Sequence, residues 1–444
     1  MSAVNAFPAT TRDWHRRVWR LAGPIILSNS TVPLVGIVDT AVVGHLPDPV
    51  YIGAVALGAV VFNFLYWGFG FLRMGTTGFV AQAFGTDDLG EVRTTLARAL
   101  LLAAVLGCAI VLLQAPIGQG VFWLLRGSTA LKALARDYYD VRIWSAPATL
   151  ANYALLGCLI GIQNTRVALL LQLALNGVNI VFALLFVLAL AWGVKGVALA
   201  AVLADYGAAI LGLWVVSKLL RPAPGQRWVH ALLDPVRLKA LLHANINILI
   251  RTLCLVFGFF YFIAAGGELG DVTLAVNAIL MHFQSFAAYG LDGFAHAAEA
   301  LVGGAYGARN LQAFRTAVRV SSVWAVVVAS LYALLYAQFG GAIVAALTGI
   351  AEVRAQAAVF MPWMVLLPLI SVWSFQLDGI FIGVTRTVEM RNGALLSVSV
   401  CIVAIWLLLP AWGNHGLWLA FTLFAAMRGL TLAAWYPRIV RELS

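Results

Sequence analysis

Charged side chains are scarce in this sequence of 444 residues: only 10% are charged, whereas 62% are hydrophobic. A soluble domain carries about 25% charged residues. Apolar runs of about 20 residues, the length that spans a bilayer, recur along the chain with short polar interruptions. These runs are continuous rather than alternating, which excludes membrane β-strands. The sequence therefore predicts an all-α integral membrane protein without a soluble domain.

Cysteines and catalytic motifs are equally sparse. The four cysteines, Cys108, Cys158, Cys254 and Cys401, all fall in apolar runs without metal-ligand spacing, so we expect core positions rather than disulfides. The sequence contains no phosphate-binding loop, zinc-binding helix or nucleophile elbow. We therefore expect neither an enzyme nor an ATP-driven pump, no cofactor and no metal centre. An ion gradient is the expected energy source.

Twelve membrane-spanning helices are predicted from the apolar runs. Basic residues concentrate in alternate loops, and the few on the opposite face are Arg126, Lys132, Arg136, Arg142, Lys195 and Arg354. This bias explains the net charge of +10 without nucleic acid, and it predicts that both termini are cytoplasmic. The expected helices span residues 21–46, 52–84, 94–118, 136–163, 167–192, 194–219, 238–264, 272–306, 316–346, 356–384, 390–411 and 414–436.

An internal repeat predicts two halves of six helices each. Phe64 and Gly157 recur as Phe286 and Gly379, each 222 positions later. Because an even number of helices separates the copies, the halves are expected to run parallel as two pseudo-symmetric lobes. The predicted organisation is a basic cytoplasmic segment at 1–20, an N-terminal lobe at 21–219, a linker at 220–237 and a C-terminal lobe at 238–437.

An acidic side chain interrupts the first apolar run at Asp39. A charge at the bilayer centre costs roughly 2.5 to 3.5 kcal/mol, so such a residue is a candidate functional site. Pro33, six residues earlier, predicts a bend or local repacking of this helix. Asn176 and Asn179 share one face of the fifth helix, and Asp205 lies on the sixth; all three are candidates for proton or cation binding. Interhelical hydrogen bonding is the alternative role of the asparagines.

Acidic residues in the second half are candidates for a substrate site or a gate. Asp292 and Glu299 follow one helical stripe with a histidine between them, and Asp378 lies in a later run. Arg73 and Arg251 are the expected counter-charges, because a lone buried charge is costly. A single helix supplies the stripe, which argues against a metal site.

Aromatic side chains are candidates for ligand contact. Most tryptophans, tyrosines and phenylalanines are expected in interfacial belts or in ordinary bundle packing. A few lie on helices expected to border a cleft between the halves, where they could stack on a flat cation or form an apolar wall. These candidates are Tyr66, Trp67, Met281, Phe286 and Tyr289.

Four motifs together resemble the multidrug and toxic compound extrusion (MATE) family, and within it the DinF branch. They occupy residues 38–45 (VDTAVVGH), 70–85, 291–307 and 377–383. The resemblance implies a twelve-helix, two-lobe antiporter that exports amphipathic, often cationic compounds. It also implies that Asp39 is the coupling carboxylate, with Asn179 beside it. Family members commonly carry an acid on helix five and a threonine on helix six, where this chain has Ala183 and Ala201.

Those two departures remove oxygen ligands from the family's proposed sodium site. Because hard cations need several oxygen ligands, the departures favour protons over sodium as the coupling ion. The expected function is thus proton-coupled multidrug export by alternating access, in the inner (cytoplasmic) membrane, by a monomer surrounded by lipid. A sodium-coupled exporter, a lipid-precursor flippase of the same superfamily and a non-transporting sensor are the alternatives. The flippase is disfavoured because the intramembrane acids outnumber Arg73 and Arg251, whereas a pyrophosphate needs a cationic cleft.

Overall fold

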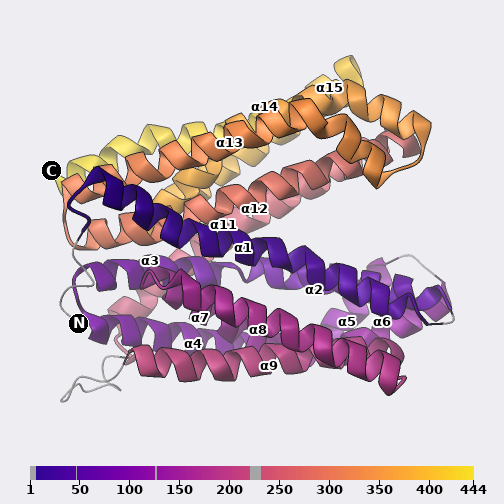
Figure 1. Cartoon of the computed structure of the whole chain (residues 1–444), viewed down its shortest axis with the longest axis horizontal. Coiled ribbons are helices and arrows are strands. Elements are labelled where there is room, and N and C mark those ends of the chain that lie inside the picture. The colour runs from indigo at the N-terminus through magenta and orange to yellow at the C-terminus, as the bar shows by residue number, and fades with distance from the viewer. Residues whose placement is uncertain (1–6, 47, 126–127, 221–231) are drawn as a thin grey trace. The chain divides into compact units, whose positions relative to one another are not determined.

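The computed structural model describes residues 7–46, 48–125, 128–220 and 232–444, and every regular element within these ranges is a helix (Figure 1). This confirms the predicted all-α class. In chain order the elements are α1 (Thr11–Val43), α2 (Val50–Gly68), α3 (Phe71–Gly85), α4 (Leu89–Leu112), α5 (Gln114–Leu124), α6 (Thr129–Arg142), the 3₁₀-helix η1 (Ile143–Ser145), α7 (Ala146–Gly161), α8 (Thr165–Leu184), the π-helix η2 (Leu185–Ala189), α9 (Gly193–Leu219), α11 (Pro235–Gly267), α12 (Asp271–Gly307), α13 (Leu311–Leu347), α14 (Ala351–Gly383) and α15 (Thr387–Leu443).

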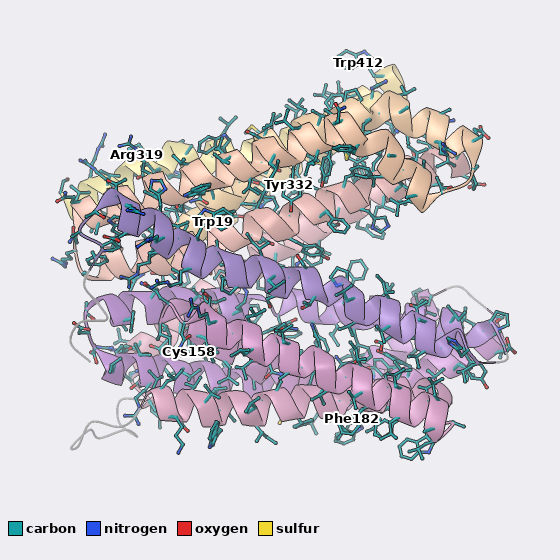
Figure 2. The ribbon with its side chains drawn as sticks, in the orientation of Figure 1. Trp19, Cys158, Phe182, Arg319, Tyr332 and Trp412 are labelled. Carbon is teal, nitrogen blue, oxygen red and sulfur yellow. The ribbon has the colours of Figure 1, made fainter. Side chains whose placement is uncertain are left out.

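Eleven helical stretches among the described residues are long and apolar enough to cross a membrane. The last of them, α15, contains Gly413 with φ 53° and ψ −132°, a conformation that is open essentially only to glycine. This residue divides α15 into two helices, so the described chain has twelve spans, as predicted. Trp412, beside the break, is 60% exposed and projects from the surface (Figure 2).

The first helix begins earlier than the predicted residue 21. Thr10 caps it: the hydroxyl accepts a hydrogen bond from the Asp13 backbone N–H at 3.2 Å and donates to the Asp13 carboxylate at 2.6 Å. The segment expected to be a separate lead-in therefore joins α1 from Thr11 onward. The helix also continues through Pro33, so the proline leaves no break in it.

The predicted third helix, 94–118, is two helices. The first, α4, ends at Leu112, and α5 begins at Gln114. Pro116 accounts for the break, because it has no backbone N–H to continue α4 but is tolerated in the first turn of a new helix.

The cysteine prediction holds for three residues and is wrong for one. Cys158, Cys254 and Cys401 are buried, and Figure 2 shows Cys158 among the helices around α7. Cys108 is exposed instead. It shares a face of α4 with Leu101, Val105 and Leu112, which are exposed as well. An exposed apolar face suits lipid, and a thiol is apolar enough to lie there.

The chain forms two compact units. The N-terminal unit comprises Leu27–Ala83 and Asp88–Ala240, and the C-terminal unit comprises Met1–Ile26, Phe84–Asp87 and Leu241–Ser444. Two helices begin in one unit and continue in the other: α1 starts in the C-terminal unit, and α11 starts in the N-terminal unit. Within the predicted linker at 220–237, residues 221–231 lie outside the described part of the chain.

Aromatic contacts place the first turns of α1 in the C-terminal unit. Trp19 makes edge-to-face contacts with Phe294 of α12 and Trp324 of α13, with ring centroids 5.3 and 5.2 Å apart. The indole N–H of Trp324 donates to His15 Nδ1 at 2.8 Å. Each aromatic pair of this kind adds about 0.5–1.5 kcal/mol to the burial of its surface.

Charged contacts hold the start of α11 in the N-terminal unit. Arg98 of α4 donates to the Leu232 carbonyl at 3.2 Å and to the Glu91 carboxylate at 3.0 Å. Glu91 also pairs with Arg237 in the first turn of α11. These contacts therefore hold the start of α11, the first helix of the second half, against α4.

The internal repeat recurs in the backbone. Asp87 and Arg309 have φ of 58° and 52°, and Gln163 and Thr385, which precede α8 and α15, have φ of 60° and 56°. Each later residue lies 222 positions after its counterpart, the displacement found in the sequence. The residues that follow the first pair cap α4 and α13, accepting hydrogen bonds from backbone N–H groups at 2.8 and 2.9 Å.

Glycines bring two helix pairs into close contact at matching points of the two halves. A Cβ added to Gly157 in α7 would collide with the backbone carbonyl of Arg73 in α3. A Cβ added to Gly379 in α14 would collide in the same way with the Ala295 carbonyl in α12. The repeated glycines therefore serve close helix packing.

Gly157→Ala is expected to lower the melting temperature, Tm, in detergent, because overpacking costs about 1–3 kcal/mol. Gly177→Ala is the matched control: nothing lies within 4 Å of a Cβ added there, and alanine is the better helix former. A thermal-shift assay compares the two variants. An unchanged Tm for Gly157→Ala would contradict the close approach of α3 and α7.

Candidate functional site

Asp39 lies near the C-terminal end of α1 and faces away from the exposed side chains of Leu34 and Ile37. It is partly buried, and its Oδ1 is shielded from solvent yet accepts no hydrogen bond from any described residue. Buried polar atoms nearly always have partners, so an exception marks a site that stability alone does not explain.

The two predicted asparagines of α8 are both buried. Asn176 donates to the Thr31 hydroxyl of α1 at 2.9 Å and accepts from Gln172 at 3.1 Å. Asn179 lies one turn further along, and its Oδ1 is the second buried oxygen of this unit that has no partner in the described chain. Asn176 thus joins α8 to the helix that carries Asp39.

A hydrogen-bond network surrounds Asp205 of α9. Its Oδ2 accepts from Arg142 Nη1 at 2.7 Å and from the Thr149 hydroxyl at 2.8 Å. The Asp205 backbone carbonyl accepts from Asn152 Nδ2 at 3.0 Å. Arg142 belongs to α6, and Thr149 and Asn152 belong to α7, so three helices meet at this residue.

Tyr66 of α2 extends the same network. Its hydroxyl lies 2.9 Å from Ser145 Oγ, and Ser145 also accepts a hydrogen bond from Arg142. The Arg142 guanidinium carbon lies 5.7 Å from the centroid of the Tyr66 ring and 5.8 Å from that of Phe62. These are cation–π distances, so two aromatic rings and a carboxylate together hold the buried guanidinium.

The prediction that Arg142 lies at the outer face is wrong. Its side chain is only 15% exposed and lies inside the N-terminal unit. Counting basic residues in loops treats every arginine as a surface group, whereas an arginine paired with a carboxylate can be buried. The positive charge of Arg142 acts on Asp39 as well as on Asp205.

Asp378 of α14 is the centre of a second charged cluster, in the C-terminal unit. Its Oδ2 pairs with Arg251 of α11 and with Arg428 of α15, the latter at 2.6 Å. The expectation that Arg251 is a counter-charge is confirmed. Arg428 was predicted only to lie within a span, and it also lies within electrostatic range of Asp292.

Glu299 of α12 is buried, and its Oε1 lies 3.1 Å from His296 Nδ1. The two residues are neighbours on one helical face, as the spacing predicts. Within the ranges that the structure describes, no three histidine, cysteine or acidic side chains come together as metal ligands would.

Comparison with known proteins identifies the chain. The family model MatE matches residues 24–185 and 248–407, more than half of the sequence. The chain belongs to the MATE family. This MATE protein is 43% identical over 430 residues to DNA damage-inducible protein F of Escherichia coli (strain K12), covering 95% of the chain and 92% of the relative. The resemblance to the DinF branch is therefore confirmed, and the protein is a transporter rather than an enzyme.

More distant MATE proteins agree with this assignment. Multidrug and toxin extrusion protein 1 of Homo sapiens is 26% identical over 330 residues, which are 73% of this chain and 56% of the human protein. An outward-facing MATE structure of the MOP superfamily matches with a TM-score of 0.85 at 17% identity, over 99% of both chains. The fold of this MATE protein is therefore that of solved family members.

The aromatic candidates of this MATE protein differ in their surroundings. Tyr66 is buried with its hydroxyl engaged, whereas Trp67 and Phe286 are exposed. Tyr289 is partly buried with its ring 6.5 Å from that of Phe286, and Met281 packs against the core of the C-terminal unit. Of these five side chains, Trp67 and Phe286 are therefore the most exposed.

Arg73, the other predicted counter-charge, lies partly buried on α3. Its charge acts on Tyr153 of α7, and its carbonyl is the group that Gly157 approaches. Arg73 therefore belongs to the α3–α7 packing of the N-terminal unit.

A polar stripe on α6, η1 and α7 is visible in the spacing of the sequence but was not among the predicted site residues. Arg142, Ser145, Thr149 and Asn152 follow one another at intervals of three, four and three residues, which is one face of a helix. All four contact Asp205 or one another in the structure. The spacing does not show, however, that Asp205 is the residue that this stripe contacts.

Proposed function

We propose that this MATE transporter is a multidrug antiporter that exports amphipathic or cationic compounds in exchange for protons. One observation carries the proposal: within a membrane span, Asp39 has a buried oxygen that no described residue satisfies. An ionisable group inside a membrane bundle is a functional site by default, and proton relays use carboxylates in this setting.

Two features favour protons over sodium at this site. Ala183 and Ala201 are buried methyl groups at positions where the family commonly has oxygen ligands. The Arg142 guanidinium acts on Asp39, and a positive charge there repels a bound metal cation. Sodium needs several oxygens and no neighbouring cation, whereas a proton needs one carboxylate.

Proton exchange sets the driving force. One proton moving inward for one monovalent cation moving outward transfers no net charge, so the membrane potential cancels. The pH difference alone then supplies roughly 1.4 kcal/mol per pH unit, which corresponds to tenfold accumulation of the substrate. A neutral substrate would instead make the exchange sensitive to the membrane potential.

The proposed setting is the inner membrane, with a monomeric chain and both termini in the cytoplasm. The concentration of basic residues in alternate loops supports this orientation, because such residues stay on the cytoplasmic side. The 43% identity to a bacterial relative supports an inner-membrane location.

The test is substrate flux in proteoliposomes under separate proton and sodium gradients. We expect a pH gradient alone to drive accumulation of a fluorescent organic cation, and a sodium gradient at fixed pH to drive none. Accumulation with sodium alone would establish the sodium-coupled alternative. Binding of the cation without flux under either gradient would establish a sensor.

A lipid-precursor flippase is the second candidate. The observation that favours it is the pair of guanidiniums at Asp378, because arginines are suited to phosphate groups. The same vesicles decide between the two: a flippase would move a fluorescent lipid pyrophosphate between leaflets and leave the organic cation untransported.

A further inference from the structure

One guanidinium in the N-terminal unit acts on two carboxylates. Arg142 Nη1 lies 2.7 Å from Asp205 Oδ2, and the positive charge of Arg142 also acts on Asp39. Tyr138, one turn earlier on α6, interacts electrostatically with both Asp39 and Arg142. Arg142 of α6 therefore contacts the carboxylate of α9 and acts electrostatically on that of α1.

The charges of this cluster balance in only one protonation state. Two ionised carboxylates and one arginine leave a single net negative charge, whereas protonation of one carboxylate leaves none. In the structure Arg142 and Thr149 both donate to Asp205, while Asp39 Oδ1 accepts no hydrogen bond from the described residues. Because a buried unpaired charge is strongly destabilising, this arrangement fits the state in which Asp39 carries the proton.

We propose that Arg142 is a shared counter-ion, whose guanidinium shifts from Asp205 toward Asp39 when Asp39 releases its proton. The inference rests on the proposed role of Asp39 as the proton carrier. Proton loss creates a carboxylate on α1 that attracts Arg142, while Asp205 keeps its hydrogen bond from Thr149. Arg142 is thus a positioning residue that transmits the protonation state of α1 to α6 and α9.

The aromatic surroundings of Arg142 are compatible with a displacement of its guanidinium. The guanidinium lies over the rings of Phe62 and Tyr66, and a planar cation can slide across aromatic faces while it keeps contact with them. Ser145 accepts a further hydrogen bond from Arg142. The hydrogen bond to Asp205 is therefore one of several contacts that hold the guanidinium.

The charged and titratable groups around the cluster come from several helices. Tyrosine hydroxyls stay neutral at physiological pH, and the arginines, including Arg73, which acts on Tyr153, stay charged. The pH response is therefore assigned to the carboxylates. The groups are Asp39 from α1, Tyr66 from α2, Tyr138 and Arg142 from α6, Tyr153 from α7 and Asp205 from α9.

The test measures how proton-driven efflux depends on pH in two variants. In Arg142→Gln/Asp205→Asn, an ion pair is removed without leaving a charge behind, and no guanidinium opposes proton binding by Asp39. The pH of half-maximal efflux should therefore rise by about one unit. In Asp205→Asn, Asp39 is the carboxylate of the cluster that remains for Arg142 to stabilise. The pH of half-maximal efflux should therefore fall by about one unit.

A matched control comes from the same helix. The exposed pair Arg136 and Asp140 lies 3.0 Å apart on α6, and Arg136→Gln/Asp140→Asn should leave the pH profile unchanged. Unshifted profiles in both test variants would overturn the proposal, because Arg142 would then only neutralise Asp205. Since the two shifts have opposite signs, one variant still decides the question if the other fails to fold.

Failure of this inference is separable from failure of the proposed function. If Asp39→Asn still accumulated substrate under a pH gradient, the proposed function would fail. If that variant lost accumulation while the Arg142 and Asp205 variants kept the wild-type pH profile, only the shared counter-ion would be ruled out.

Discussion

Asp39→Asn is expected to abolish accumulation driven by a pH gradient while leaving the protein folded. Asparagine preserves the size and polarity of the side chain but cannot take up or release a proton. The wild-type protein, exchanging one proton per monovalent cation, should accumulate substrate about tenfold per pH unit, and the variant should accumulate none. The measurement is uptake of a fluorescent organic cation into proteoliposomes under an imposed pH difference without sodium.

Two further variants control this experiment. Asp13→Asn removes an exposed acid from the other end of α1 and should keep wild-type accumulation. Asp39→Glu keeps a carboxyl group and should retain part of the wild-type accumulation. Sustained accumulation by Asp39→Asn would show that another group carries the proton.

Asp378→Ala is expected to cause the largest loss of stability. It leaves the guanidiniums of Arg251 and Arg428 buried without their shared carboxylate. Breaking a buried pair by removing one partner costs about 3–5 kcal/mol, which corresponds to an apparent Tm lower by roughly 10 °C. A thermal-shift measurement in detergent, with the wild-type protein alongside, records the change.

The charge origin of that loss can be separated from the loss of volume. Asp378→Ala/Arg251→Met/Arg428→Met removes all three charges and should recover most of the Tm, because an apolar replacement of a buried ion cluster is often neutral. Asp137→Ala removes one partner of an exposed pair with Lys195 and should change stability by less than about 1 kcal/mol. A triple variant no more stable than Asp378→Ala would refute the electrostatic explanation.

The spans and the repeat could be predicted because both are local or periodic signals. Apolar runs mark each helix, and glycines such as Gly157 and Gly379 recur at one displacement because each meets a backbone carbonyl. The start of α1 was misplaced because a charged first turn resembles a surface segment. The structure shows that this turn is helical from Thr11 and that Thr10 caps it through its hydrogen bonds with Asp13.

The site could be predicted only in part. Asp39 stands out in sequence because it is charged within an apolar run, and Arg251 follows from the need for a counter-charge. The pairs of Arg142 with Asp205 and of Arg428 with Asp378 join residues 63 and 50 positions apart. Composition and spacing carry no information about such pairing, because tertiary packing decides which helices face one another.

The crossing of α1 from one unit to the other has a consequence for assembly during synthesis. Residues Thr11–Ile26 leave the ribosome long before Phe294 and Trp324, the aromatic groups on which Trp19 rests. Domains generally fold as units, N-terminal first, but here the earliest segment belongs to the later unit. The indole of Trp19 therefore lies in lipid or against temporary neighbours until α12 and α13 have been inserted, and its native contacts form only then.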